Sequence, residues 1–239
     1  MTAQMTFKRY ELKYLLTKQD KERLLAAMEP HMKLDSYGRT IIRNLYFDTD
    51  SFLLIRRSLE KPAYKEKLRI RSYQTAEPSD PVFVELKKKY KSVVYKRRLV
   101  LEEEKAMESF LKGTPLPVQS QIAREIEYFR GYYGDLHPTV FLSYEREAYY
   151  ALDGSDFRVT FDENILYRTH DLSLGSRVYG SPLLGEGQTL MEIKTSGSIP
   201  LWMSHVLTRQ RLYKTSFSKY GSAYRRMLEA EMKGGLCYA

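Results

Sequence analysis

Charged side chains occupy every second position in several apolar segments of this 239-residue sequence. In "KLRIRSY", Lys67, Arg69 and Arg71 alternate with Leu68 and Ile70. Alternate side chains of a β-strand point to the same face, so these three cations would share one face. Ammonium and guanidinium groups are the side chains that bind phosphate oxygens best, so such a face suits phosphate chemistry.

The same alternation recurs in other segments. The further sets are Arg9/Glu11/Lys13, Glu85/Lys87/Lys89, Lys96/Arg98, Tyr144/Arg146, Arg158/Thr160/Asp162 and Glu192/Lys194. Cations outnumber carboxylates in them. A few carboxylates among many cations would suit a hard divalent cation that bridges the phosphates of a ligand.

Two arrangements of the strands fit this pattern. In the simpler one, an open sheet is covered by helices on one side and its charged face lies in water, which is the ordinary interpretation of any single strand. In the other, about eight strands close into a barrel whose interior can hold one small ligand. Uncompensated cations inside would cost several kcal/mol per ion, so this arrangement requires a polyanion in the interior or compensation by carboxylates and water. Glu11, Glu85, Asp162 and Glu192 are placed to compensate them.

The hydrophobic periodicity predicts where the elements that position these residues begin and end. We expect strands at 7–16, 41–50, 64–73, 82–90, 92–104, 138–150, 157–168 and 189–197. We expect helices at 17–30, 51–60, 102–113, 120–134, 200–213 and 218–232. Thr17 is a candidate cap for the first helix. No linker divides the chain, so residues 1–239 are expected to form a single domain.

The composition is that of a soluble globular protein, with 43% hydrophobic and 29% charged residues. A formal net charge of +9 favours an anionic partner. The single cysteine, Cys237, excludes an intrachain disulfide, and the four histidines lack metal-ligand spacing. The N-terminal residues do not resemble a signal peptide and no apolar run approaches membrane-spanning length, so we expect a cytoplasmic protein.

The order of the motifs resembles a known family. The sequence contains, in order, "FKRYELKYLL", "YFDT", "KLRIRSY", "FVELKKK", "VVYKRR", "SYERE", "FRVTFD", "LMEIKTSG" and "FSKYGSAY". This series is similar to the CYTH-like triphosphate tunnel metalloenzymes. More narrowly, it resembles the catalytic domain of the vacuolar transporter chaperone (VTC) polyphosphate polymerases. The resemblance covers about Phe7 to Arg226.

The resemblance implies a fold and a site. The fold would be α+β, with a closed antiparallel β-barrel of about eight strands that forms a basic tunnel and helices outside and at its ends. The implied catalytic residues are Lys13, Arg69, Arg71, Lys87, Arg146, Arg158 and Glu192. The implied substrate-binding residues are Lys96, Arg98, Tyr144, Lys194, Ser218 and Lys219. The implied ligands of Mn²⁺ or Mg²⁺ are Glu192, Glu11 and Glu85. The choice of Lys87 over Lys88 or Lys89 depends on strand register.

The function that follows from the resemblance is synthesis of polyphosphate from the terminal phosphate of ATP. The alternatives are a tripolyphosphatase or nucleoside triphosphatase with the same fold, in which Glu11 or Glu85 orients water, and a non-catalytic polyphosphate-binding module. The expected ligands are ATP and polyphosphate or triphosphate. Nucleic acid is not expected, because no nucleic-acid-binding motif is present. A membrane protein that receives the product is compatible with this interpretation, although no motif marks one.

Overall fold

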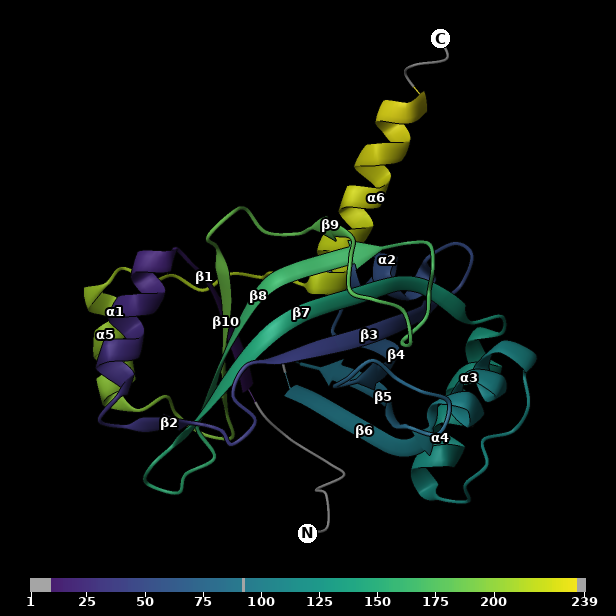
Figure 1. Cartoon of the computed structure of the whole chain (residues 1–239), viewed down its shortest axis with the longest axis horizontal. Coiled ribbons are helices and arrows are strands. Elements are labelled where there is room, and N and C mark those ends of the chain that lie inside the picture. The colour runs from purple at the N-terminus through teal and green to yellow at the C-terminus, as the bar shows by residue number, and fades with distance from the viewer. Residues whose placement is uncertain (1–9, 92, 236–239) are drawn as a thin grey trace.

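The computed structural model describes residues 10–91 and 93–235 (Figure 1). The predicted positions Phe7, Arg9 and Cys237 lie outside this part. The strands are β1 (Tyr10–Leu16), β2 (Met32–Leu34), β3 (Thr40–Asp48), β4 (Tyr64–Ser72), β5 (Pro81–Tyr90), β6 (Val93–Glu102), β7 (His137–Ala151), β8 (Arg158–Arg168), β9 (Ser181–Pro182) and β10 (Thr189–Thr195). The helices are α1 (Lys18–Met28), α2 (Leu53–Leu59), α3 (Glu103–Lys112), α4 (Gln121–Tyr133), α5 (Leu201–Arg209) and α6 (Lys219–Gly235).

All strands belong to one antiparallel sheet, in the order β1-β10-β8-β7-β3-β4-β5-β6, with β2 added to β7 and β9 added to β8. The predicted α+β composition and antiparallel pairing are therefore found. The strands β2 and β9 were not predicted, because segments of three and two residues are too short to show alternation.

The prediction of a closed barrel is wrong. The hydrogen-bonded path ends at β1 and at β6, and no ladder joins these two strands. The free edge of β1 is partly used by the segment before α6, because the Thr215 N–H donates to the Lys13 carbonyl at 2.7 Å. Near this seam a side-chain ion pair joins Lys87 of β5 to Glu11 of β1 at 2.9 Å. Alternation identifies which side chains share a face, but not which edges of a sheet pair.

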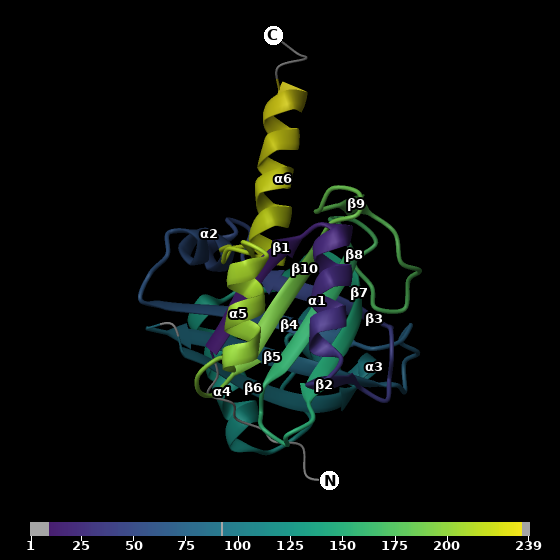
Figure 2. The same cartoon turned by 90° about the vertical axis from the view of Figure 1, so that its left-hand side faces the viewer.

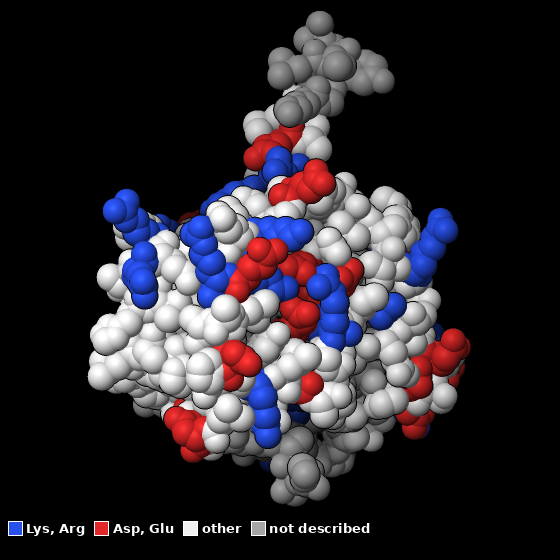
Figure 3. Space-filling model, turned by 60° about the vertical axis from the view of Figure 1, so that its left-hand side comes forward, with Lys and Arg blue, Asp and Glu red and all other residues white. Residues whose placement is uncertain are grey.

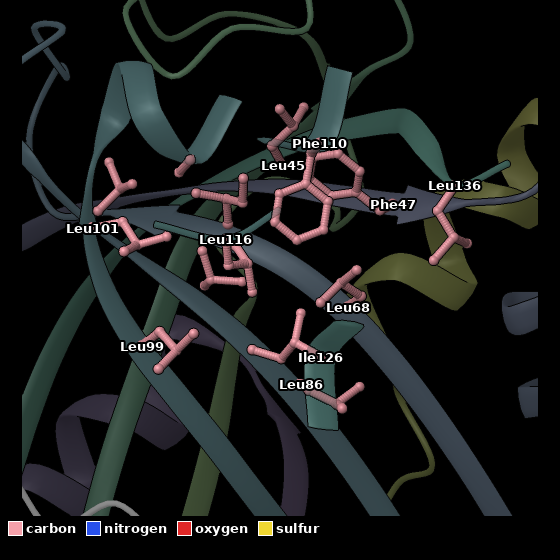
Figure 4. Close-up of a cluster of buried hydrophobic side chains, with 14 of the residues drawn as sticks. Leu45, Phe47, Leu68, Leu86, Leu99, Leu101, Phe110, Leu116, Ile126 and Leu136 are labelled. Carbon is pink, nitrogen blue, oxygen red and sulfur yellow. The ribbon is translucent and has the colours of Figure 1, made fainter. Parts of the chain in front are cut away.

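The apolar side of the curved sheet is covered by two pairs of helices (Figures 1 and 2). The first pair, α3 and α4, buries Phe110 and Ile126 against Leu45, Phe47 and neighbouring strand residues (Figure 4). The second pair, α1 and α5, covers β1, β8 and β10, with a core that includes Leu24, Met203, Phe161 and Ile193. Because the apolar alternates of the strands pack outward beneath these helices, the charged alternates face the concave side.

The last helix has a different position. The first turns of α6 pack against the concave face at one end of the sheet, where Tyr220 stacks on Tyr46 at 4.7 Å between ring centroids. The rest of α6 extends away from the body (Figures 1 and 2). Its Tyr220 hydroxyl donates to buried Asp48, which also accepts the backbone N–H groups of Leu54 and Ile55 in α2. Asp48 therefore fixes α2 and α6 to the end of β3.

Local signals mark the ends of several helices, and the predicted cap Thr17 is one of them, whereas α5 ends at Arg209 and not at the predicted 213. Thr17 is the N-cap of α1 and forms a capping box with Asp20. Ser120 caps α4 through a 3.0 Å hydrogen bond from the Ala123 N–H. Gly113 ends α3 in the left-handed conformation. None of the described helices has the length and hydropathy needed to cross a lipid bilayer.

Candidate functional site

The concave face encloses a cavity of about 730 Å³. Its wall, as far as the structure describes it, includes eleven Lys and Arg side chains but only three carboxylates, Glu11, Asp35 and Glu192. The cations come from β1, β4, β5, β6, β7, β8, β10 and α6. They are Lys13, Lys67, Arg69, Arg71, Lys87, Lys96, Arg98, Arg146, Arg158, Lys194 and Lys219. The open sheet thus still forms a basic hollow of the size that binds small molecules.

Fourteen of the fifteen residues that the sequence singled out line this cavity. They are Glu11, Lys13, Arg69, Arg71, Lys87, Lys96, Arg98, Tyr144, Arg146, Arg158, Glu192, Lys194, Ser218 and Lys219. The fifteenth, Glu85, lies behind the cavity wall and is only 1% exposed. Alternation on successive antiparallel strands brings the twelve strand residues together, because neighbouring strands keep their inward positions in register. Ser218 and Lys219 come instead from the start of α6.

Glu85 organises one group of cations. Its two carboxylate oxygens contact Arg69 Nη2 at 2.7 Å, Lys96 Nζ at 2.7 Å and Arg98 Nη2 at 2.5 Å. Burial alone would raise the pKa of Glu85, but Arg71, Arg69, Lys96 and Arg98 together hold that pKa well below its ordinary value. The carboxylate therefore stays ionised and has its oxygens occupied by cations of β4 and β6.

Glu192 and Asp162 organise a second group. Glu192 contacts Lys219 at 3.1 Å, Lys194 at 3.0 Å, Lys13 at 3.3 Å and Arg146 at 3.3 Å. Asp162 forms a two-pronged pair with Arg146, at 2.5 and 2.6 Å, and also contacts Lys219 at 2.5 Å. Burial would raise the pKa of Glu192, but Lys219, Lys194 and Lys13 hold it well below its ordinary value.

Tyr144 and Arg71 lie between the two groups. The Arg71 guanidinium donates to the Tyr144 hydroxyl at 3.1 Å and to the buried Asn44 side chain at 3.0 Å. Burial would raise the pKa of Tyr144, but the neighbouring Arg146, Arg71 and Lys219 lower it overall. Its hydroxyl is therefore a good hydrogen-bond donor toward an anion in the cavity.

The three predicted metal ligands do not meet at one point. Within the described part of the chain, no group of three or more His, Cys, Asp or Glu side chains is arranged to hold a metal ion. Glu11 and Glu192 do approach one another, because the Lys13 ammonium contacts Glu11 at 3.4 Å and Glu192 at 3.3 Å. Two carboxylates fit a Mg²⁺-like ion, which takes its other ligands from substrate phosphates and water. Glu85 is held by a different set of cations.

The strand register at the lysine run is resolved by contacts. Lys87 Nζ lies 2.9 Å from Glu11 and lines the cavity. Lys88 points the other way, toward Glu66 and Glu125, each at 3.9 Å. Lys87 is thus the inward residue, as expected.

The predicted site omitted Lys67, which lines the cavity, and Asn44, which is buried and holds Arg71. Lys67 lines the cavity and donates to the Ser218 hydroxyl at 3.0 Å. The alternation of Lys67 with Arg69 and Arg71 indicated that it shares their face. The predicted site omitted it because the motif that carries the resemblance is the pair of arginines. Asn44, which positions Arg71, gave no signal because a lone Asn in an apolar strand has no distinctive spacing.

A third group of charges lies on the outer surface of β7 and β8. Lys21 contacts Glu147 at 2.7 Å and Glu163 at 2.9 Å, and Arg39 contacts Glu145 at 2.5 Å. Figure 3 shows one face of the molecule on which acidic side chains gather beside basic ones. Because three carboxylates, Glu145, Glu147 and Glu163, face two cations here, this network is an ion-paired surface feature and not an anion site.

Comparisons with known proteins agree with this fold. No curated protein matches the sequence. A proposed adenylate cyclase from Bacillus halodurans is similar in structure, with a TM-score of 0.57 at 15% identity, covering 90% of this chain and 96% of that chain. A proposed adenylate cyclase from Vibrio parahaemolyticus has a TM-score of 0.51 at 10% identity, covering 91% of this chain and 98% of that chain. The VTC domain family matches residues 8–228. The chain therefore belongs to the VTC domain family.

Proposed function

We propose that this protein is a metal-dependent phosphotransferase that moves the terminal phosphoryl group of ATP onto a polyphosphate chain, with residues 1–239 acting as one domain. The observation that supports this most is the cavity itself, in which cations from seven strands and one helix surround about 730 Å³. Such a wall is stable only if anions compensate it. A linear chain of phosphates supplies many oxygens and several charges within a narrow shape.

The cations would bind and orient the phosphates. Arginine side chains offer planar pairs of N–H donors, which suit phosphate oxygens, and lysines act as mobile point charges. Glu85, Asp162 and Glu192 hold several of these cations in place before the ligand arrives. Preorganised charges of this kind stabilise the charge that spreads over a transferring phosphoryl group. No side-chain nucleophile is required, since a terminal oxygen of the polyphosphate chain can attack the γ-phosphorus of ATP in line, which breaks the bond to the β-phosphate oxygen and releases ADP.

A divalent ion is part of the proposal. Glu192 would hold Mn²⁺ or Mg²⁺ with help from Glu11, because Lys13 already brings these two carboxylates together. When bound, the ion would supply positive charge that neutralises the phosphate oxygens. The side chains of the cavity wall would still align the phosphate chain and exclude bulk water.

The side-chain contacts favour transfer over hydrolysis. A hydrolase needs a carboxylate that is free to orient water. Glu85 is fully engaged by Arg69, Lys96 and Arg98, and Glu11 is assigned to the divalent ion in this proposal. A duplex nucleic acid is disfavoured for a different reason, because these cations lie inside a hollow.

The test is to incubate the purified protein with ATP and Mn²⁺ and to measure long-chain polyphosphate and free phosphate in the same sample. The proposal predicts polyphosphate as the main product and its loss in Glu192→Gln. Free phosphate without chain product would show a hydrolase. ATP binding without either product, unchanged in Glu192→Gln, would show a binding module.

A further inference from the structure

Three exposed tyrosines surround one end of the cavity. Tyr10, Tyr37 and Tyr73 all line it, yet they remain 47%, 80% and 42% exposed. We call them the tyrosine rim. Large aromatic side chains that are both exposed and part of a cavity wall are typical of ligand contacts.

The strand register places the rim at one end. Tyr10 pairs with Thr195, next to Lys194, and Tyr73 follows the end of β4, two residues after Arg71. Tyr37 precedes Thr40, the first residue of β3. The first turns of α6 fill the opposite end, where Tyr220 stacks on Tyr46. The cavity is therefore basic in its middle, closed by α6 at one end and aromatic at the other.

Tyr73 is held in a defined position. Its ring meets Phe83 edge to face, at 5.4 Å and 79°, and the Arg71 guanidinium lies 5.9 Å from the ring centre. Arg98 reaches its hydroxyl at 3.5 Å. The ring therefore lies beside Arg71, so a base stacked on it would have its phosphates close to the cavity cations.

Tyr37 is presented by a fixed turn. Its N–H donates to the Asp35 side chain at 3.1 Å, and the Gly38 N–H donates to the Asp35 carbonyl at 3.2 Å. Gly38 has a φ of +61°, which a glycine adopts without strain. The Asp35 N–H donates to the Ala148 carbonyl of β7 at 2.8 Å, so the turn is anchored to the sheet.

We propose that the tyrosine rim binds the base of a nucleoside triphosphate whose phosphates occupy the basic cavity. This rests on the proposed phosphate site and adds the expectation that a nucleotide binds more tightly than inorganic tripolyphosphate. Stacking accepts any base, because every base has a π-face. ATP and GTP therefore bind with similar affinity.

Calorimetric titration with ATP and with inorganic tripolyphosphate tests this inference. Tyr73→Ala and Tyr37→Ala each weaken ATP binding about ten-fold, the size of one lost stacking contact, and leave tripolyphosphate binding within about two-fold. Tyr73→Phe, which keeps the ring, retains ATP binding. Tyr213→Ala is the matched control, because Tyr213 is 79% exposed and does not line the cavity.

Two results would overturn the inference. One is unchanged ATP binding in both alanine variants. The other is an equal loss of ATP and tripolyphosphate binding, which would give these tyrosines a structural role. If the unmodified protein bound neither ligand, the proposed phosphate site would itself be wrong, and this outcome is distinguished from the others before any variant is made.

Discussion

Lys67 Nζ lies 3.0 Å from the hydroxyl oxygen of Ser218, and this hydrogen bond joins β4 to the start of α6. The same oxygen accepts the Gly221 N–H at 3.2 Å in the first turn of that helix. Among the side chains that the structure describes, no carboxylate pairs with Lys67. Burial and the neighbouring Lys13 and Lys87 lower its pKa to about 7. This ammonium is therefore available for an anion in the cavity.

The first prediction concerns Lys67→Met. Removing an uncompensated cation should raise the Tm of the free protein by about 2–4 °C. It should weaken tripolyphosphate binding about ten-fold, as expected for one lost charge-assisted hydrogen bond. Thermal unfolding and titration measure the two effects. A lower Tm together with unchanged binding would mean that Lys67 is only a structural link to α6.

The second prediction concerns pH. Lys96 also has a pKa lowered to about 7, by burial and by Arg71 and Arg98 against the opposing effect of Glu85. Both lysines are charged below about pH 7 and neutral above it in the free protein, and a bound polyanion favours the charged form. Tripolyphosphate affinity should therefore fall as pH rises from 6 to 8.5.

Tripolyphosphate itself loses protons between about pH 6 and 8.5. The dependence of its affinity on pH must therefore be compared between the unmodified protein and a variant. The double variant Lys67→Met/Lys96→Met should show a flatter affinity–pH curve than the unmodified protein. Parallel curves would contradict the assignment. By linkage, the unfolded protein binds more protons at these lysines between about pH 7 and 10.5, so the two groups make the free protein more stable as pH rises across this window.

The third prediction concerns Glu85→Gln. The change leaves Arg69, Lys96 and Arg98 without their shared carboxylate and should destabilise the free protein by about 3–5 kcal/mol, as for a broken buried ion pair. A bound phosphate chain replaces the lost negative charge. Tripolyphosphate should therefore raise the Tm of Glu85→Gln more than that of the unmodified protein. An equal rise in both proteins would place the ligand away from this cluster.

The fourth prediction compares two neighbouring lysines. Lys87 faces the cavity and Lys88 faces Glu66 and Glu125 on the other side of the sheet. Lys87→Met should weaken tripolyphosphate binding about ten-fold, whereas Lys88→Met should change it by less than about two-fold. An equal loss of tripolyphosphate binding in both variants would contradict this. It would mean that the lysines attract the ligand at long range without contacting it, and the loss in both variants would then be larger at lower salt concentration.

Alternation predicted which side chains line the cavity better than it predicted how the edges of the sheet pair. The residues of the cavity wall, including Lys13, Arg146 and Glu192, could be found because side-chain period and antiparallel register act together. Whether the sheet closes into a barrel could not be predicted from alternation, because closure depends on backbone hydrogen bonds at the edge of β1. At that edge the Thr215 N–H donates to the Lys13 carbonyl. The role of Glu85 could not be predicted either. Alternation places this residue on the inward face of the sheet, but it does not show that longer side chains separate Glu85 from the cavity.

The central claim is that the concave cavity holds a linear phosphate chain, and a crystal structure with tripolyphosphate and Mn²⁺ tests it most directly. The account predicts phosphates in contact with Arg69, Arg71 and Arg146, and an anomalous peak for manganese beside Glu192. An anion bound only on the outer surface, with the cavity cations still paired to their carboxylates, would contradict it.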